Sequence, residues 1–249
     1  AFGCDDSGFG GAFSSWYYKN PTRHAQFAAM ITRLDTQVGE IFAKLEEKGL
    51  ADNTLVIFTS DNGPHEEGGA DPDWFNRDGL LRGTKRSTHE GGIRVPFIVK
   101  GPGVPAGTVT DHQLAFYDLM PTLLDYAGLN GDAYSRKAST ATQYWDGISF
   151  NNTLRGNDAE QEKHEFLYWE FPKFRGGNGW LCVRMGRWKG LVEDVADGNT
   201  RMQLYDIVTD VREERDVAAE NPQIVAAMWQ AIQQSHTDVE NPLFRLETK

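Results

Sequence analysis

The chain has 249 residues, of which 39% are hydrophobic, and this is enough to bury the core of one large domain, or of a large domain with a small partner. Its formal net charge of -11 argues against a nucleic-acid surface, because phosphate binding needs a clustered excess of Lys and Arg. The sequence has no apolar run of about 18 residues and no signal-peptide pattern at its start, so we expect no membrane-spanning helix.

The first half of the sequence predicts an α/β unit. Within residues 24–48 apolar residues recur at intervals of three or four, which predicts one face of an amphipathic helix, and Gly49 supplies its end. The apolar run 54–59 predicts a strand buried on both faces, as in a parallel sheet covered by helices. A long glycine-rich loop follows, and then a second strand within 93–103 and a second helix at 115–129.

The second half has a different pattern. Residues 130–163 are polar and rich in Gly, Asn and Ser, which favours a linker or a surface excursion. Short aromatic and β-branched runs at 165–171, 180–193 and 202–208 predict a small antiparallel sheet. A final amphipathic helix is expected at about 221–235.

These elements predict an α/β fold with a mostly parallel sheet sandwiched by helices, followed by a small antiparallel sheet with a C-terminal helix. We expect three parts: an N-terminal tail at 1–22, an α/β part at 23–150 and a small α+β subdomain at 151–249. Two cysteines, Cys4 and Cys182, are too few for a disulfide scaffold or a zinc cage, and they do not fix the redox compartment.

The end of the first strand carries a candidate metal site. In open α/β sheets ligands bind beyond the carboxyl ends of the strands, and Asp61 and Asn62 follow the run 54–59 directly. A carboxylate and a carboxamide offer hard oxygen ligands that suit Ca²⁺ or Mg²⁺. Two ligands do not complete a calcium shell, and an ordinary Asp-Asn-Gly turn is the alternative.

Several separated motifs together resemble a known family. The strand before "DNG" leads to a Gly-flanked loop, "RGTK", that contains Lys85, and then to "EGGIRVP" before the next strand. "AAMITRLDTQVGEI", "DLMPTLLDYAGL" and "LYDIVTDVREERDVAAENP" appear in the matching order. From about Phe27 to Phe244 the chain resembles the C-terminal part of the type I, formylglycine-dependent sulfatases, which are arylsulfatase-like members of the alkaline phosphatase superfamily. The resemblance implies an incomplete alkaline-phosphatase-like fold.

The resemblance also implies roles for individual residues. Asp61 and Asn62 are similar to the later two protein ligands of a Ca²⁺, a site at which Mg²⁺ is also considered, and Lys85 to the lysine that contacts a sulfate oxygen. A fixed cation and a compact ammonium suit a sulfate ester, because charge develops on its oxygens as the S–O bond breaks. Apart from the resemblance, His65 follows the Asp-Asn-Gly turn by two residues, which makes it a candidate to donate to a substrate hydroxyl or sulfate or to shuttle a proton. The alternatives are a solvated lysine and a surface or packing histidine.

Residues around these motifs are given structural or substrate roles. We expect His89 to pack, and Glu90 and Arg94 to form an ion pair that holds the loop. Three aromatic residues either stack on a sugar ring or belong to the core: Trp74, Phe75 and Trp169. Trp169 and Glu170, in the small C-terminal sheet, are expected to shape the substrate pocket.

The chain departs from the family pattern at its nucleophile. These sulfatases attack with a formylglycine made from the Cys or Ser of a C/S-x-P-x-R motif, and that motif is absent here, since Cys4 precedes "DDSG" and Cys182 precedes "VRMG". The segment "CDDSGFGG" resembles the one that supplies the first two metal ligands, which would be Asp5 and Asp6, and an acidic tail is the alternative. We therefore expect the C-terminal part of a longer sulfatase, or the product of a truncated gene.

The expected function is that of a sulfuric ester hydrolase acting on a sulfated carbohydrate. The alternatives are a phosphomonoesterase or phosphodiesterase of the same superfamily, or a non-catalytic chain that binds a cation or a sulfated glycan. The expected partner is a sulfated small molecule or glycan, with self-association if the chain is truncated, because an uncovered sheet edge pairs with other chains. The resemblance implies a periplasmic or extracellular location.

Overall fold

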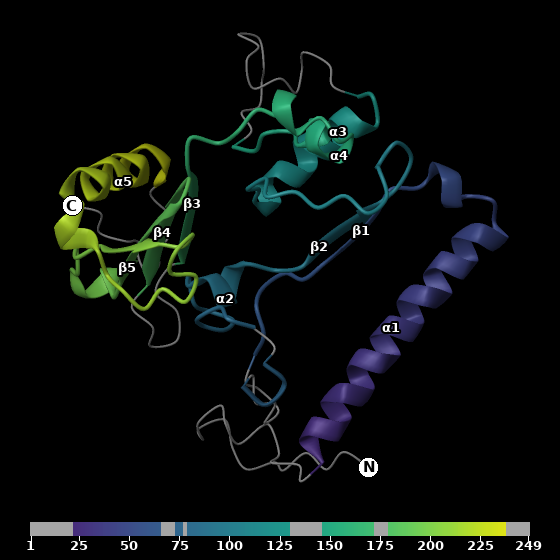
Figure 1. Cartoon of the computed structure of the whole chain (residues 1–249), viewed down its shortest axis with the longest axis horizontal. Helices are drawn as coiled ribbons and strands as arrows, with labels where there is room; N and C mark the ends of the chain where they lie inside the picture. The colour runs from purple at the N-terminus through teal and green to yellow at the C-terminus, as the bar shows by residue number, and fades with distance from the viewer. Residues whose placement is uncertain (1–21, 66–72, 77–78, 130–145, 172–178, 238–249) are drawn as a thin grey trace. The chain divides into compact units, whose positions relative to one another are not determined.

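The structure is a computed structural model, and it describes residues 22–65, 73–76, 79–129, 146–171 and 179–237 (Figure 1). The chain forms two compact units. The first comprises Ala1–Thr54, Phe58–Phe97 and Thr209–Glu214, and the second comprises Leu55–Ile57, Ile98–Val208 and Arg215–Lys249. The boundaries expected at 22 and 150 stay predictions.

The first helix of the first unit is α1 (Arg23–Glu47), which confirms the helix predicted from its periodicity. It ends in a Schellman motif, in which the Gly49 amide donates to the Glu46 carbonyl and the Leu50 amide to the Leu45 carbonyl. Gly49 adopts a φ of 65°, which a residue with a side chain rarely does. Part of the predicted apolar face is exposed, at Met30, Ile31, Leu34 and Ile41.

Short helices follow α1 in the first unit. A 3-10 turn, η2 (Ala51–Asn53), leads from α1 toward the first strand, and η4 (Asp73–Phe75) lies in the long loop. A single helical turn, α2 (Glu90–Ile93), precedes the second strand. None of the helices within the described residues is both long and apolar enough to cross a bilayer.

The two predicted strands pair as a two-stranded sheet, β1 (Val56–Thr59) with β2 (Phe97–Lys100). The prediction that residues 54–59 are buried on both faces was wrong, because Phe58 is 39% exposed and Ile98 in the partner strand is 61% exposed. The second strand is also shorter than predicted. Pro96 has no amide hydrogen to donate to a ladder, so the strand begins after it.

The second unit begins with helical segments. The predicted helix at 115–129 is confirmed as η5 (Phe116–Asp118) running into α3 (Leu119–Tyr126). Much of the predicted linker lies outside the described residues, but its end forms α4 (Asn151–Leu154) and η7 (Asp158–Glu160).

The predicted antiparallel sheet is confirmed. Its four strands pair in sequence order, as β3-β4-β5-β6, and each pair is antiparallel. The strands are β3 (Leu167–Phe171), β4 (Trp180–Met185), β5 (Trp188–Glu193) and β6 (Gln203–Asp206), with the 3-10 turns η8 (Val195–Asp197) before β6 and η9 (Ala218–Glu220) after it.

The final helix, α5 (Pro222–Ser235), covers this sheet and forms a core with it (Figure 1). Met228 and Ile232 of α5 are buried against Leu181 and Val183 of β4 in one hydrophobic cluster. The approach is close at Gly190 of β5, where an added Cβ would lie 2.6 Å from the Met228 sulfur. The helix is amphipathic as its sequence predicted.

Candidate active site

The Asp-Asn-Gly turn lies directly after β1 and is held by short local hydrogen bonds. Ser60 Oγ donates to the Asn62 carbonyl over 2.9 Å, and Asn62 Nδ2 donates to the Gly63 carbonyl over 3.0 Å. This bond uses the amide nitrogen of Asn62, and the side-chain oxygen Oδ1 is a separate atom that can accept a hydrogen bond or bind a cation. Asp61 is exposed, so both hard oxygens are available at the same turn.

Main-chain hydrogen bonds bring the Lys85 loop to this turn. The Lys85 amide donates to the Pro64 carbonyl over 2.8 Å, and the Gly63 amide donates to the Gly92 carbonyl over 2.9 Å. Asp61, Asn62 and Lys85, predicted from separate motifs, therefore lie on two segments that are bonded to each other. His65, which is half-buried, directly follows the residue that accepts the Lys85 amide.

The loop around Lys85 is itself tightly turned. The Ser87 amide donates to the Thr84 carbonyl over 2.9 Å, which places Lys85 and Arg86 at the centre of a turn. Arg86 adopts a φ of 76°, a conformation that costs energy for a residue with a side chain. The backbone of this loop thus fixes the position of the Lys85 Cα atom, from which the side chain extends.

Three glycines allow the two segments to approach this closely. An added Cβ on Gly63 would lie 1.8 Å from the Gly91 carbonyl oxygen, and one on Gly91 would lie 2.2 Å from the Gly83 carbonyl oxygen. At Gly92 an added Cβ would lie 2.1 Å from the Ser87 carbonyl oxygen. Glycine is therefore required at Gly63 by its contact with the "EGG" backbone, and at Gly91 and Gly92 by their contacts with the backbone of the Lys85 loop.

A residue that sequence reasoning missed, Glu213, anchors the same loop. Its side chain accepts the Glu90 amide over 2.7 Å, and its carbonyl accepts Arg82 Nη1 over 2.6 Å. Glu213 is fully buried and has a φ of 54°. The only signal for it was its place in the "VREERD" stretch that resembles the family, which carried no role by itself.

The residues on either side of the Gly91-Gly92 pair make structural contacts within the loop. His89 is buried, and its Nδ1 lies 3.0 Å from Ser87 Oγ, as expected for a packing residue. The predicted pair of Glu90 and Arg94 is confirmed at 3.8 Å, with Arg94 62% exposed, so it contributes little to stability.

The aromatic residues of the long loop lie at the surface. Trp74 is 65% exposed, and its ring stacks on His24 of α1 with ring centroids 4.1 Å apart. Phe75 is 40% exposed and contacts Phe27 and His24. Trp74 and Phe75 are thus not core residues, and whether they contact a sugar stays a prediction.

In the C-terminal sheet, Glu170 accepts two hydrogen bonds. Tyr168 donates its hydroxyl to Glu170 Oε2, and His236 Nδ1 lies 2.7 Å from the same oxygen. Burial and then the bond to Glu170 raise the pKa of the Tyr168 phenol, which stays neutral as a donor. Glu170 joins β3 to the residue that follows α5, and Trp169 lies half-buried beside it. Their role in shaping a pocket stays a prediction.

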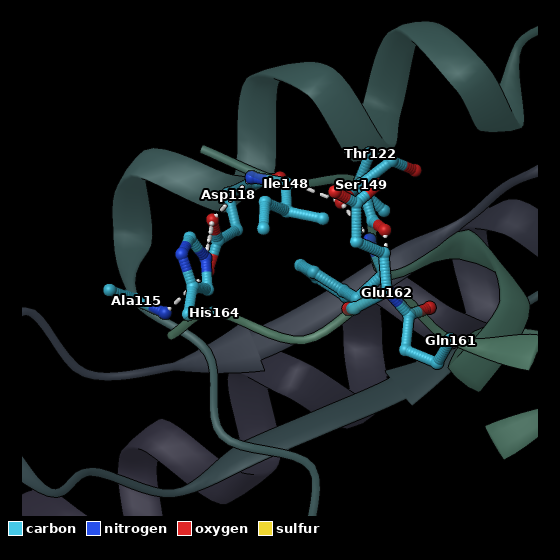
Figure 2. Close-up of polar contacts among 9 residues, drawn as sticks. Ala115, Asp118, Thr122, Ile148, Ser149, Gln161, Glu162 and His164 are labelled. Atoms are coloured by element: carbon cyan, nitrogen blue, oxygen red, sulfur yellow. Dashed lines mark hydrogen bonds and ion pairs between the residues drawn. The ribbon is translucent and has the colours of Figure 1, made fainter. Parts of the chain in front are cut away.

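A second buried polar network lies in the second unit and was also missed (Figure 2). Asp118 Oδ2 accepts the Ala115 amide, and Oδ1 accepts the Ile148 amide and lies 2.8 Å from His164 Nε2. Thr122 Oγ1 donates to the Asp118 carbonyl. The Asp118 side chain is 1% exposed, so this network holds the start of α3 against the segments at 148 and 164.

Asp61 and Asn62 are candidate ligands for a metal ion. Within the described part of the chain no group of three or more His, Cys, Asp or Glu side chains gathers as a metal cluster. Asp61 and Asn62 fit a hard cation as two of its ligands, whereas Ca²⁺ takes six to eight. Asp5 and Asp6 lie outside the described residues.

Family models match most of the chain. A model described as Sulfatase matches residues 8–129, and one described as N-sulphoglucosamine sulphohydrolase, C-terminal, matches residues 83–238. The chain belongs to the sulfatase family.

Individual sulfatases match over a similar range. The chain is 30% identical to N-acetylgalactosamine-6-O-sulfatase of Bacteroides thetaiotaomicron over 84% of its length, and 32% identical to human arylsulfatase A over 71%. It spans 41% and 32% of the lengths of these two proteins. The crystal structure of Ps i-CgsB in complex with k-i-k-neocarrahexaose matches 87% of the chain with a TM-score of 0.66 and 28% identity, and the chain covers 43% of that structure. This likeness to a sulfatase-family fold confirms the predicted fold class.

Proposed function

We propose that this chain supplies the second half of the metal and sulfate site of a sulfuric ester hydrolase that acts on sulfated carbohydrate. The observation that carries the proposal is the hydrogen bond from the Lys85 amide to the Pro64 carbonyl, which joins the lysine loop to the Asp-Asn-Gly turn. A carboxylate, a carboxamide oxygen and an ammonium then lie on two bonded segments. That set suits a substrate with a charged, oxygen-rich head group.

Asp61 and Asn62 would hold a divalent cation, for which Ca²⁺ is proposed and Mg²⁺ is the alternative. Such a cation would neutralise the charge that develops on the sulfate oxygens. The chain's own contribution is orientation. The bond from Asn62 Nδ2 to the Gly63 carbonyl restrains the amide group before any cation binds, so less conformational freedom is lost on binding.

Lys85 is proposed to contact a sulfate oxygen. Its three ammonium protons can donate to an oxyanion, and its half-buried position makes that interaction stronger than in bulk water. His65 is proposed to donate to a substrate hydroxyl or to the sulfate. No residue of this sequence is assigned as the nucleophile, because a C/S-x-P-x-R motif does not occur in it.

A sulfated glycan is the proposed substrate class. Support comes from the name of the N-acetylgalactosamine-6-O-sulfatase and from the oligosaccharide bound to the related Ps i-CgsB. By the same family resemblance we propose a periplasmic or extracellular location.

The test compares 4-nitrophenyl sulfate with 4-nitrophenyl phosphate as substrates of the gene product that carries this sequence. The proposal predicts release of 4-nitrophenol from the sulfate in preference to the phosphate. Preference for the phosphate would contradict it and favour a phosphoesterase, and turnover of neither, with calcium binding retained, would favour a binding protein.

A further inference from the structure

The second unit contains a pocket that no residue of the proposed sulfate site lines. Its volume is about 520 Å³, within the range of small-molecule sites. Its walls are formed by the segment 109–113, by Asp158, by four residues of the stretch 163–167, and by Arg184 and Gly186.

Hydrogen bonds hold these walls in place. Gln113 Nε2 donates to the Gly186 carbonyl over 3.1 Å, and Arg184 Nε donates to the same carbonyl over 2.6 Å. Thr110 Oγ1 donates to Asp158 Oδ2 over 2.9 Å. The pocket is therefore a built feature, in which three stretches of the chain are tied together around one space.

The lining combines an apolar surface with cationic groups. Phe166 and the buried Leu167 contribute apolar surface, while Lys163 and Arg184 contribute positive charge. Leu167 and Arg184 are opposite each other in the register of β3 and β4, so the guanidinium is placed by a paired strand. An apolar face beside cations suits a sugar ring with an anionic substituent.

Two imidazoles and two carboxylates complete the lining. His164 is oriented by the buried Asp118 through Nε2, so its Nδ1 is the ring nitrogen left for a ligand (Figure 2). His112 also lines the pocket. Asp111 and Asp158 balance the two cations and are acceptors for hydroxyl groups. A bare anion would meet these carboxylates unfavourably, whereas a ligand that carries both hydroxyls and a sulfate satisfies both kinds of group.

We propose that this pocket binds a sulfate-bearing sugar unit of a glycan, with Lys163 and Arg184 pairing with the sulfate and Phe166 packing against the ring. The choice of a sulfated sugar rests on the proposed function, but the pocket and its charges do not. The same sulfate chemistry is offered by free inorganic sulfate, and the experiment separates the two sources.

The experiment measures binding by calorimetry on the full chain, with a chondroitin 6-sulfate tetrasaccharide, its desulfated counterpart and sodium sulfate as probes. The test variant is Lys163→Gln with Arg184→Gln, which removes the charges but keeps most of each side chain. The matched control is Lys48→Gln with Arg201→Gln, two exposed cations outside the pocket. Circular dichroism and thermal unfolding establish that each variant folds.

The expected result is that the sulfated tetrasaccharide binds, that the pocket variant weakens this binding about tenfold or more, and that the control variant leaves it unchanged. The desulfated probe and sodium sulfate are expected to bind more weakly than the sulfated tetrasaccharide. Equal binding by the pocket variant, or equal binding of sodium sulfate, would overturn the proposal. Loss of binding in Asp61→Ala but not in the pocket variant would also overturn it, while supporting the sulfate site of the proposed function.

Discussion

The amide of Lys85 donates a hydrogen bond of 2.8 Å to the carbonyl oxygen of Pro64. This bond is made by the main chain, so the place of Lys85 relative to the Asp-Asn-Gly turn does not depend on its own side chain. A substitution of the lysine should therefore remove an ammonium without moving the turn. A loss of activity in such a variant would then report on the ammonium group itself.

Close backbone packing predicts that Gly63→Ala is destabilising. The new Cβ would meet the Gly91 carbonyl oxygen at 1.8 Å, so the turn or the "EGG" segment must move, at a cost of about 1–3 kcal/mol. Gly39→Ala, on an exposed position of α1 with nothing within 4 Å, is the control and should stabilise by about 0.5–1 kcal/mol. Urea unfolding measures both. Equal stability of Gly63→Ala and the wild-type chain would show that the two segments are not packed in this way.

The proposed metal ligands predict a selective loss of calcium affinity. Asp61→Ala removes a charged ligand and should lower the affinity of the gene product for Ca²⁺ at least about tenfold, and Asn62→Ala should have a smaller effect because a neutral oxygen is lost. Asp35→Ala, an exposed acid on α1, should leave the affinity unchanged. Calorimetric titration with CaCl₂ measures this. A similar affinity in Asp61→Ala and Asp35→Ala would refute the assignment.

The buried network predicts that Asp118→Asn is strongly destabilising. Both carboxylate oxygens accept hydrogen bonds, so an amide group would face a donor that is buried and cannot be rehydrated. The expected loss is about 2–4 kcal/mol in the free energy of unfolding. Asp111→Asn, an exposed neighbour, should change stability by less than about 0.5 kcal/mol. If the two variants unfold at the same denaturant concentration, the network does not stabilise the chain.

His112 predicts a pH effect on stability. Burial lowers its pKa; the nearby Asp118 and Asp158 raise it, and His164 and Lys163 lower it. In the unfolded chain the imidazole of His112 has an ordinary pKa of about 6.5, so it takes up a proton at a higher pH than in the folded chain. The contribution of neutral His112 to stability is therefore present above that pH and is lost as the pH falls. His112→Gln should therefore lose less stability than the wild-type chain between about pH 8 and about pH 5. An imidazole titration midpoint by NMR above the ordinary value would contradict this.

Local periodicity predicted the regular elements well. The spacing of apolar residues on α1 and α5 and the short aromatic runs of β3 to β6 are local signals, and the structure confirms them. Local periodicity was less successful in predicting burial. An apolar run such as 54–59 indicates a strand but does not say what covers it, and Phe58 is exposed. The start of β2 was misplaced because the effect of Pro96 on the ladder was not weighed.

The candidate site was predicted from motifs, but its supports were not. Asp61 and Asn62 were singled out by their place after a strand and by their hard oxygen atoms, and the resemblance to the family assigned the roles of these two residues and of Lys85. Glu213 contacts Glu90 across 123 positions, and His164 contacts Asp118 across 46 positions. No local pattern reports such a pair, because each partner alone is an ordinary polar residue.

The most direct measurement is the kcat/KM of the gene product for 4-nitrophenyl sulfate, compared between the wild-type sequence, Lys85→Ala and the control Lys48→Ala. A sulfate site that contains Lys85 predicts a fall of about 100-fold or more in Lys85→Ala, with Lys48→Ala unchanged, because one oxyanion donor is lost. A Lys85→Ala protein that hydrolyses the sulfate ester at the wild-type rate would contradict the assignment of this site.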